Sequence, residues 1–158
     1  MVAKSTLSQY EIERNKPMPS LNHSILQINL GIALAVYKEK YTLASELKLK
    51  LPPDNWESVP DISILPKTKL NFKKDVTAYT DPPLATIEIL SPTQSLTDLT
   101  SKTQAYFKYG VKSCWIVLPE FKNIYVFTSN DNYEIFKDTD TLLDKNLDIS
   151  FSLNEIFQ

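Results

Sequence analysis

Two short apolar segments of the sequence each carry a single carboxylate. Asp61 lies within residues 59–65, and Glu88 lies within residues 84–92. Both segments are rich in β-branched and apolar residues and are bounded by prolines, which predicts two strands. A carboxylate is costly to bury unless it is paired, hydrogen-bonded or bound to a metal. If the two strands lie side by side, Asp61 and Glu88 could together bind a divalent cation.

Both acids also have a structural interpretation. Asp61 could cap a turn after Pro60. Glu88 could serve packing alone, but it interrupts a run of apolar and β-branched neighbours in a segment that reads as a central strand. The metal-binding interpretation explains both acids with one site, and it depends on how the flanking elements position the two strands.

The N-terminal half is expected to form one helix and several strands. Residues 7–17 suggest a short turn and one strand. Asn22 would cap a helix that runs to about Tyr41, and alternating apolar and charged residues predict a half-exposed strand over residues 42–51. A loop that contains four lysines, residues 66–83, would join the two acid-bearing strands.

The C-terminal half adds a second helix and more strands. This helix is expected over residues 95–109, since Gly110 suits the position that follows a helix end. Strands are then expected over residues 113–118, 123–128 and 133–137, and residues 153–157 would form a strand or a short helix. The order of elements predicts an α/β or α+β domain with a mixed sheet flanked by helices.

Composition excludes several function classes. Gly31 and Gly110 are the only glycines, which excludes a Walker A loop and a G-x-G-x-x-G nucleotide fingerprint. With one cysteine, Cys114, and one histidine, His23, a Cys/His zinc cluster is excluded as well. The net charge of −2 argues against a uniformly basic surface for nucleic acid.

Length and hydrophobicity predict an ordinary globular protein in a reducing compartment. The 158 residues, of which 42% are hydrophobic and 23% charged, are expected to form one domain. No stretch approaches the roughly 18–20 apolar residues of a membrane span, and no secretory signal is evident. Cys114 lies in an apolar run, which predicts a buried thiol, and the expected location is the cytoplasm.

The ordered motifs resemble the Uma family of restriction-endonuclease domains, within the PD-(D/E)XK nuclease superfamily. The resemblance extends over nearly the whole chain. The residues that carry it are Tyr10-Glu11-Ile12, Asn22-His23-Ser24 with Leu30 and Leu34, Pro60-Asp61-Ile62-Ser63, Ile87-Glu88-Ile89-Leu90-Ser91-Pro92, Asp98 with Lys102 and Tyr106, Tyr109-Gly110-Val111, and Cys114-Trp115-Ile116-Val117. The resemblance implies a restriction endonuclease-like core with a central mixed sheet.

The same resemblance implies a metal-dependent DNA endonuclease. Phosphodiester hydrolysis needs a Lewis acid, and Mg²⁺ or Mn²⁺ on Asp61 and Glu88 would supply it. The usual motif has a lysine two residues after the second acid, but this chain has Leu90 there. In the family a lysine of the following helix takes over, and Lys102 is the matching residue. It shares a helix face with Asp98, and a surface pair of the two, worth about 0.3–0.5 kcal/mol, is the structural alternative.

Three further side chains are candidates for the same pocket. Glu11 and Glu46 would add carboxylates, although solvated strand residues are the more common role for such acids. His23 lies at the start of the first expected helix, where capping or packing is the alternative. The lysines of residues 67–74 could contact phosphate or form a solvated loop. The expected partners are DNA and, by analogy with enzymes that reach both strands of a duplex, a second copy of the chain.

Two other functions remain open on sequence grounds. Leu90 and the acidic net charge favour a catalytically degenerate module that retains the fold and binds nucleic acid or protein. A metal-dependent hydrolase of a smaller phosphate ester is a further alternative. DNA cleavage, DNA binding without metal, and competition by nucleotides would distinguish the three.

Overall fold

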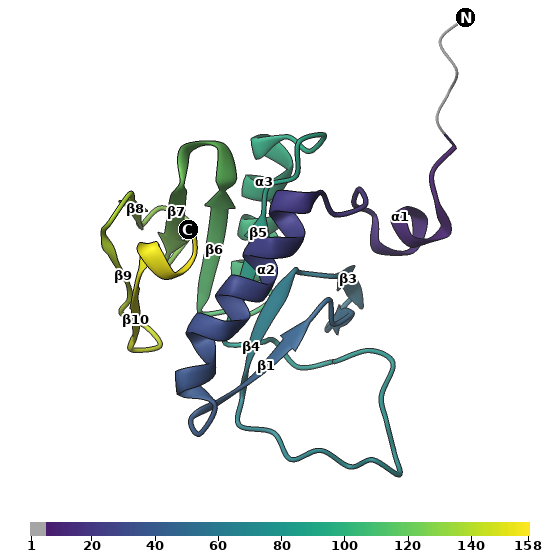
Figure 1. The fold of residues 1–158 in the computed structure, drawn as a ribbon. Helices are drawn as coiled ribbons and strands as arrows, with labels where there is room; N and C mark the ends of the chain where they lie inside the picture. Colours follow the sequence, from purple (N-terminus) through teal and green to yellow (C-terminus); the bar gives the residue numbers. More distant parts are fainter. Residues whose placement is uncertain (1–5) are drawn as a thin grey trace, which may run out of the picture.

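A mixed six-stranded sheet lies at the centre of residues 6–158, the part of the chain that the computed structural model describes (Figure 1). In spatial order its strands are β1 (Tyr41–Ser45), β4 (Ile62–Pro66), β5 (Ala85–Ile89), β6 (Ser113–Leu118), β7 (Asn123–Phe127) and β8 (Tyr133–Lys137). β5 and β6 are parallel, and the other neighbours are antiparallel. The predicted mixed sheet with flanking helices is confirmed.

Helix α3 (Leu96–Lys108) connects β5 to β6 and packs on one face of the sheet. The Ser95 hydroxyl accepts a hydrogen bond from the Asp98 N–H, and the Asp98 carboxylate accepts one from the Ser95 N–H. This reciprocal cap fixes the start of the helix. The helix ends before Gly110, whose φ of 100° is a conformation that glycine adopts readily. The second predicted helix is confirmed to within a residue at each end.

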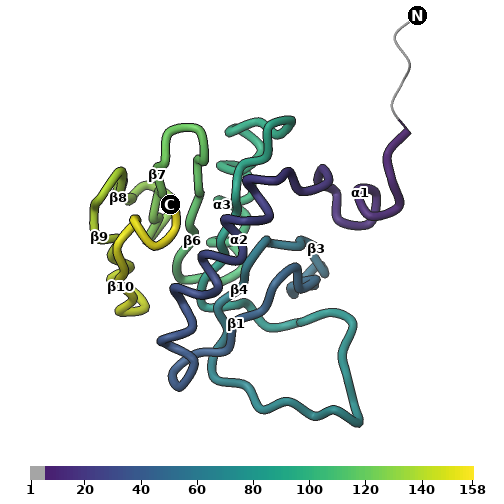
Figure 2. The backbone as a smooth tube through the Cα atoms, viewed as in Figure 1, coloured from purple at the N-terminus to yellow at the C-terminus, as the bar shows by residue number. Residues whose placement is uncertain are grey.

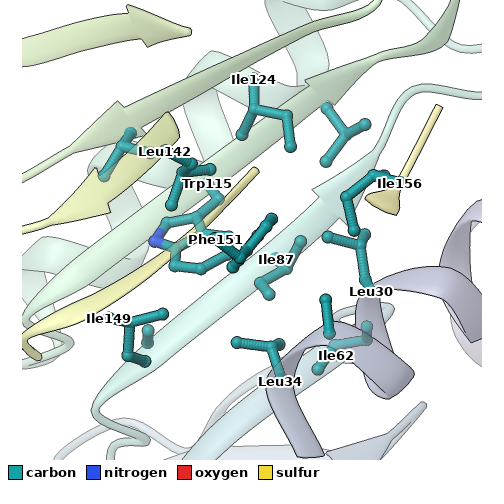
Figure 3. Packing of buried hydrophobic residues seen from close by; sticks show 14 of the residues in the cluster. Leu30, Leu34, Ile62, Ile87, Trp115, Ile124, Leu142, Ile149, Phe151 and Ile156 are labelled. Atoms are coloured by element: carbon teal, nitrogen blue, oxygen red, sulfur yellow. The ribbon is translucent and has the colours of Figure 1, made fainter. Parts of the chain in front are cut away.

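Helix α2 (Leu21–Leu34) lies across the opposite face of the sheet (Figure 1). Its buried leucines include Leu30 and Leu34, and Figure 3 shows both pointing toward Ile62 of β4 and Ile87 of β5. All four side chains are 3% exposed or less. The sheet is therefore covered on both faces, with α2 on one side and α3 on the other.

Both ends of the first helix differ from the prediction. Ser20 rather than Asn22 is the cap, because the Ser20 hydroxyl accepts a hydrogen bond from the backbone N–H three residues on, at 3.3 Å. The helix ends at Leu34, earlier than expected, and continues into a short 3-10 turn, Ala35–Tyr37. The chain then enters β1 at Tyr41, the residue at which the helix was predicted to end.

The strand predicted over residues 42–51 is interrupted. Glu46 has a φ of 50°, a left-handed conformation that breaks the extended chain after β1. A separate strand, β2 (Leu49–Leu51), then pairs with β3 (Trp56–Ser58) in a small two-stranded sheet. The alternating leucines and lysines thus belong to two elements, since one residue in left-handed conformation ends the pairing with β4.

The strand predicted within residues 7–17 is wrong, because a helix forms there. α1 (Gln9–Arg14) begins after Ser8, whose hydroxyl accepts a hydrogen bond from the Glu11 N–H at 3.3 Å. The Glu11 carboxylate accepts one in return from the Ser8 N–H at 2.7 Å. In Figure 2 the chain runs from α1, on the side of the molecule where β3 lies, back to the start of α2.

A C-terminal hairpin was not predicted from the sequence. β9 (Thr141–Asp144) and β10 (Ile149–Ser152) pair antiparallel, and a 3-10 turn, Leu153–Glu155, follows. Figure 3 shows Phe151 beside Trp115 of β6 in the core that α2 also covers. The hairpin therefore completes the α2 face of the sheet. The 3-10 turn agrees with the short helix that was one alternative for residues 153–157.

Other sequence expectations are confirmed. β4 ends at Pro66 and β5 begins at Ala85, so the predicted lysine-containing loop joins them. Cys114 is buried, and burial raises the pKa of its thiol to about 12. Among the helices of residues 6–158, none has the length and apolarity that crossing a membrane requires.

Candidate active site

Asp61 and Glu88 lie at the same end of the pairing between β4 and β5. Ile62 pairs with Ile87 at the last paired position of this end, where Asp61 directly precedes Ile62 and Glu88 directly follows Ile87. The Ile89 N–H donates a hydrogen bond to Oδ2 of Asp61 at 2.7 Å, which ties the two strand ends together. The carboxylates are buried, with Asp61 1% and Glu88 3% exposed.

Asp61 has two side-chain partners from the N-terminal part of the chain. Lys16, in the segment between α1 and α2, places Nζ 2.6 Å from Oδ1 of Asp61 and also donates to the Val59 carbonyl at 2.9 Å. His23, in the first turn of α2, places Nε2 3.1 Å from Oδ2. The other ring nitrogen of His23, Nδ1, is buried and has no hydrogen-bond partner within residues 6–158. Asp61 thus joins the α1–α2 segment and α2 to the sheet.

These contacts decide the ionisation of Asp61. Burial raises the pKa of the carboxyl, but the hydrogen bond from His23, the charge of Lys16 and the Ile89 N–H lower it by more. The pKa of Asp61 therefore lies below its usual value, and the side chain is a carboxylate at neutral pH.

Glu88 has a matching set of partners on the α3 side. Its Oε1 accepts hydrogen bonds from Lys102 Nζ at 2.9 Å and from the Tyr106 hydroxyl at 2.8 Å. Lys102 and Tyr106 lie one turn apart on α3, so one helix face supplies both donors. The Ser58 hydroxyl lies 2.7 Å from that of Tyr106 and extends the network to β3.

Tyr106 is fully buried in this network. Burial raises the pKa of its phenol well above the usual value, and the charge of Glu88 raises it further. The hydroxyl is therefore protonated across the neutral range and remains a donor to Glu88. Tyr106 is more than an aromatic at the core edge, because it holds the Glu88 carboxylate in a fixed orientation.

The site contains its own counterions. Asp61 and Glu88 carry two negative charges, and Lys16 and Lys102 carry two positive charges at 2.6 and 2.9 Å from them. Unpaired buried charges are strongly destabilising, so these lysines make the burial of both acids possible. Lys16 is nearly buried and Lys102 is the more accessible, with 7% and 23% of their side chains exposed.

A cleft of about 490 Å³ opens beside Lys102. α3 contributes Asp98 and Lys102 to its lining, and Trp56 of β3 forms part of the wall. Asn15 and Pro17, the neighbours of Lys16 in sequence, line the same cleft. The cleft therefore reaches the site at Lys102, the partner of Glu88, whereas neither Asp61 nor Glu88 is part of its lining.

The sequence model of the Uma2 family, described as "Putative restriction endonuclease", matches residues 3–154. The chain belongs to the Uma2 family. The predicted resemblance is confirmed, since the match extends over nearly the whole sequence. No curated protein matches the chain.

A solved structure has the same fold as this Uma2 chain. It is the crystal structure of a "putative nuclease belonging to DUF820" from Anabaena variabilis, 24% identical in sequence. The superposition has a TM-score of 0.77 and covers 89% of this chain and 83% of that one. At this identity the similarity establishes the fold, and the family match assigns the chain to a nuclease family.

The position at which this Uma2 sequence departs from the usual nuclease motif is a packing position. Leu90 packs against the apolar cluster of Leu99, Ile116 and Leu118 beneath α3. A lysine two residues after Glu88 is thus replaced by an apolar contact. The helix supplies the ammonium group that the strand lacks, since Lys102 reaches Glu88 directly.

The two additional acids that the sequence proposed have other partners. The Glu46 N–H donates to the Asp61 carbonyl at 3.1 Å, so its backbone adjoins the site. Its carboxylate accepts a hydrogen bond from the Tyr10 hydroxyl and lies 3.7 Å from Arg14 Nε. The Glu11 carboxylate caps the start of α1 and also accepts a hydrogen bond from the Met18 N–H at 3.4 Å. Asp98 has the same role in α3 and forms no ion pair with Lys102 among the described residues.

Lys16 is the site residue that the sequence did not reveal. It lies 45 positions before Asp61, in the irregular segment of residues 15–20 between α1 and α2. Neither periodicity nor a motif marks it, and only the path of the chain after α1 brings it to the acid. His23 was among the candidates, and the structure places it on Asp61 as well as in the first turn of α2.

Proposed function

We propose that the chain is a metal-dependent DNA endonuclease that hydrolyses phosphodiester bonds at the site formed by Asp61, Glu88 and Lys102. The observation that supports it is a pair of buried carboxylates at the same end of two adjacent strands, where Asp61 accepts a hydrogen bond from the Ile89 N–H next to Glu88 and Lys102 Nζ lies 2.9 Å from Glu88. Family membership supports the same reaction class.

The residues present fit a magnesium or manganese ion. Mg²⁺ is usually held by one or two carboxylates together with water and substrate oxygens. Asp61 and Glu88 are two such ligands, and Oε2 of Glu88 accepts no hydrogen bond from any group in residues 6–158. No cluster of three or more metal-ligating side chains forms within those residues, so the remaining ligands would be water and phosphate oxygens.

Each residue has a separate part in the proposed reaction. A Mg²⁺ or Mn²⁺ ion held by Asp61 and Glu88 would act as a Lewis acid toward the phosphoryl oxygens and would lower the pKa of a bound water. Lys102 offsets negative charge that develops on the phosphate, since its ammonium group lies beside the carboxylate at the edge of the cleft. Tyr106 orients Glu88, and His23 with the Ile89 N–H orients Asp61.

The charge balance of the site makes metal binding depend on whether DNA is bound. Two carboxylates and two ammonium groups already cancel, so a divalent cation alone would leave an excess of positive charge. A phosphodiester group carries a negative charge and offsets part of that excess. Metal and DNA are therefore expected to bind cooperatively, with weak metal binding in the absence of DNA.

Replacing Lys102 tests the proposed chemistry. We expect Lys102→Met to lower the rate of duplex cleavage in Mg²⁺ by about 10²–10³-fold, as the loss of one charge-stabilising donor does in other enzymes. Lys108→Met, at an exposed position of the same helix, is the matched control and should cleave at the wild-type rate. The measurement is the initial rate on a labelled duplex, with an EDTA blank.

Two outcomes would contradict the proposal. One is a wild-type protein that cleaves no DNA with Mg²⁺ or Mn²⁺. The other is cleavage at an unchanged rate by Lys102→Met. A wild-type protein that binds duplex DNA with an unchanged affinity in EDTA and never cleaves it would identify the degenerate binding module instead.

Replacing Lys16 tests the charge balance without an activity assay. We expect Lys16→Met to bind Mn²⁺ at least about tenfold more tightly than wild type, because a cation beside Asp61 is removed. The apoprotein should be less stable, and added Mn²⁺ should raise its melting temperature more than that of wild type. Lys73→Met, in the exposed loop, serves as the control for net charge. Equal metal affinity in Lys16→Met and wild type would contradict the charge argument.

A further inference from the structure

The outer side of α2 carries an apolar stripe that the fold does not bury. Leu21, Ile25, Ile28 and Ile32 are 76, 47, 65 and 68% exposed, and Val36 in the following 3-10 turn is 77% exposed. Figure 1 shows α2 in front of the sheet, with no described element over its outer side. The residues that α2 packs against the sheet belong to its other face, so this stripe is not needed for the core.

The spacing of the stripe is typical of helix pairing. Leu21, Ile25, Ile28 and Ile32 are separated by four, three and four residues, the heptad pattern by which one helix packs along another. A helix that packs on a sheet needs one apolar face, the one toward the sheet, and the exposed stripe of α2 is an additional apolar face. An apolar helix face of this spacing therefore fits a helical partner.

A groove runs beside the stripe, between α2 and β1. Its volume is about 660 Å³, and its lining includes Ile28, Gly31 and Ile32 of the helix and Leu43 of β1. A Cβ at Gly31 would meet nothing within 4 Å, so no neighbour in the chain requires glycine there. Glycine in a helix interior is unfavourable. Its presence on this open face leaves room for the close approach of another backbone.

Charge also favours a second copy of the chain as the occupant. Residues 21–37, which form α2 and the 3-10 turn, contain no Asp, Glu, Lys or Arg. In a twofold-symmetric contact a residue near the axis meets its own copy, where any charge would repel itself. A stripe without charges is therefore suited to pairing with itself.

The exposed area is close to what a dimer contact needs. The five side chains of the stripe expose on the order of 600 Å², at the upper end of the largest apolar patches of monomers. A standard interface buries about 800 Å² on each partner. The stripe alone supplies about three-quarters of this area.

We propose that the chain forms a twofold-symmetric homodimer in which α2 of each copy packs along α2 of its partner, with Gly31 at the close approach. This proposal does not depend on the proposed nuclease activity. It uses only the exposed stripe, the groove and the uncharged helix.

Sedimentation equilibrium of the full chain tests the proposal. We expect a dimer at micromolar concentration, and Ile32→Glu should weaken dimerisation at least 100-fold while the circular dichroism spectrum is unchanged. Phe72→Glu, a control at a 91% exposed aromatic of the β4–β5 loop, should leave the dimer intact. A wild-type protein that is monomeric at all concentrations, or an Ile32→Glu variant as dimeric as wild type, would overturn the proposal.

A cross-link keeps the test decisive if Ile32→Glu fails to fold. Cys114 is the only cysteine of the sequence and is buried, so a thiol introduced by Ile28→Cys is the accessible one. Mild oxidation should convert Ile28→Cys into a disulfide-linked dimer. A thiol introduced by Phe72→Cys should give little cross-linking. Equal cross-linking of the two variants would contradict the placement of the interface on α2.

Discussion

Glu88→Gln is expected to lower metal-dependent DNA cleavage by at least about 10³-fold, which corresponds to about 4 kcal/mol of transition-state stabilisation. The amide oxygen can still accept the hydrogen bonds of Lys102 and Tyr106, so the fold should be retained. The negative charge that would bind the ion is lost, and with it the Lewis acid of the proposed reaction. The measurement is the initial cleavage rate of a labelled duplex in Mg²⁺ and in Mn²⁺.

Asp61→Asn should remove cleavage to a similar extent but also reduce stability. Both oxygens of Asp61 accept hydrogen bonds, from Lys16 on one side and from the Ile89 N–H on the other. In Asp61→Asn the amide NH₂ group would face one of these two donors, and the hydrogen bond at that position would be lost. The free energy of unfolding must therefore be measured alongside activity. Asp131→Asn, at an exposed aspartate outside the cleft, is the control and should cleave within about twofold of wild type. For the Glu88→Gln variant, an initial cleavage rate within tenfold of the wild-type rate would exclude Glu88 from the reaction.

Asp144→Ala is expected to lower the free energy of unfolding by about 3–5 kcal/mol, because several buried donors would lose one acceptor. The carboxylate is fully buried, and its Oδ1 accepts from the Ser113 hydroxyl at 2.9 Å. Its Oδ2 accepts from Trp115 Nε1 at 2.8 Å. Two backbone N–H groups of the β9–β10 turn, those of Asn146 and Leu147, donate to Oδ1 as well.

Urea unfolding measures this effect directly. Asp131→Ala, at an exposed aspartate, should change stability by less than about 0.5 kcal/mol and controls for the loss of a negative charge. Asp144→Asn should fall between the two, since the amide keeps one acceptor. A loss below about 1 kcal/mol in Asp144→Ala would mean that Asp144 does not fasten the C-terminal hairpin to β6.

The parts of the fold that were predictable have local signals. α3 has a cap at Ser95, regular apolar spacing and a glycine beyond its end, and these determine a helix independently of the rest of the chain. β9 was missed because Asp144 stands in an aspartate-rich stretch that resembles a loop. Only the tertiary structure shows that Asp144 is buried and that the stretch forms a hairpin.

The candidate site also contains residues that were predictable from sequence and one that was not. Asp61 and Glu88 were detectable because a carboxylate in an apolar strand has few structural explanations. Lys102 was found through the family resemblance and confirmed as a neighbour of Glu88 by the fold. Lys16 could not be found, since its role depends on a contact across 45 residues and on the turn between α1 and α2.

The lysines that neutralise Asp61 and Glu88 have a consequence for how the protein is assembled. A site built of carboxylates alone would need an ion before the surrounding chain could close over it. Here Lys16 and Lys102 are covalent parts of the chain, so the acids can be buried during folding at any concentration of free metal. The folded state should therefore resist chelating agents, with an unchanged melting temperature in EDTA.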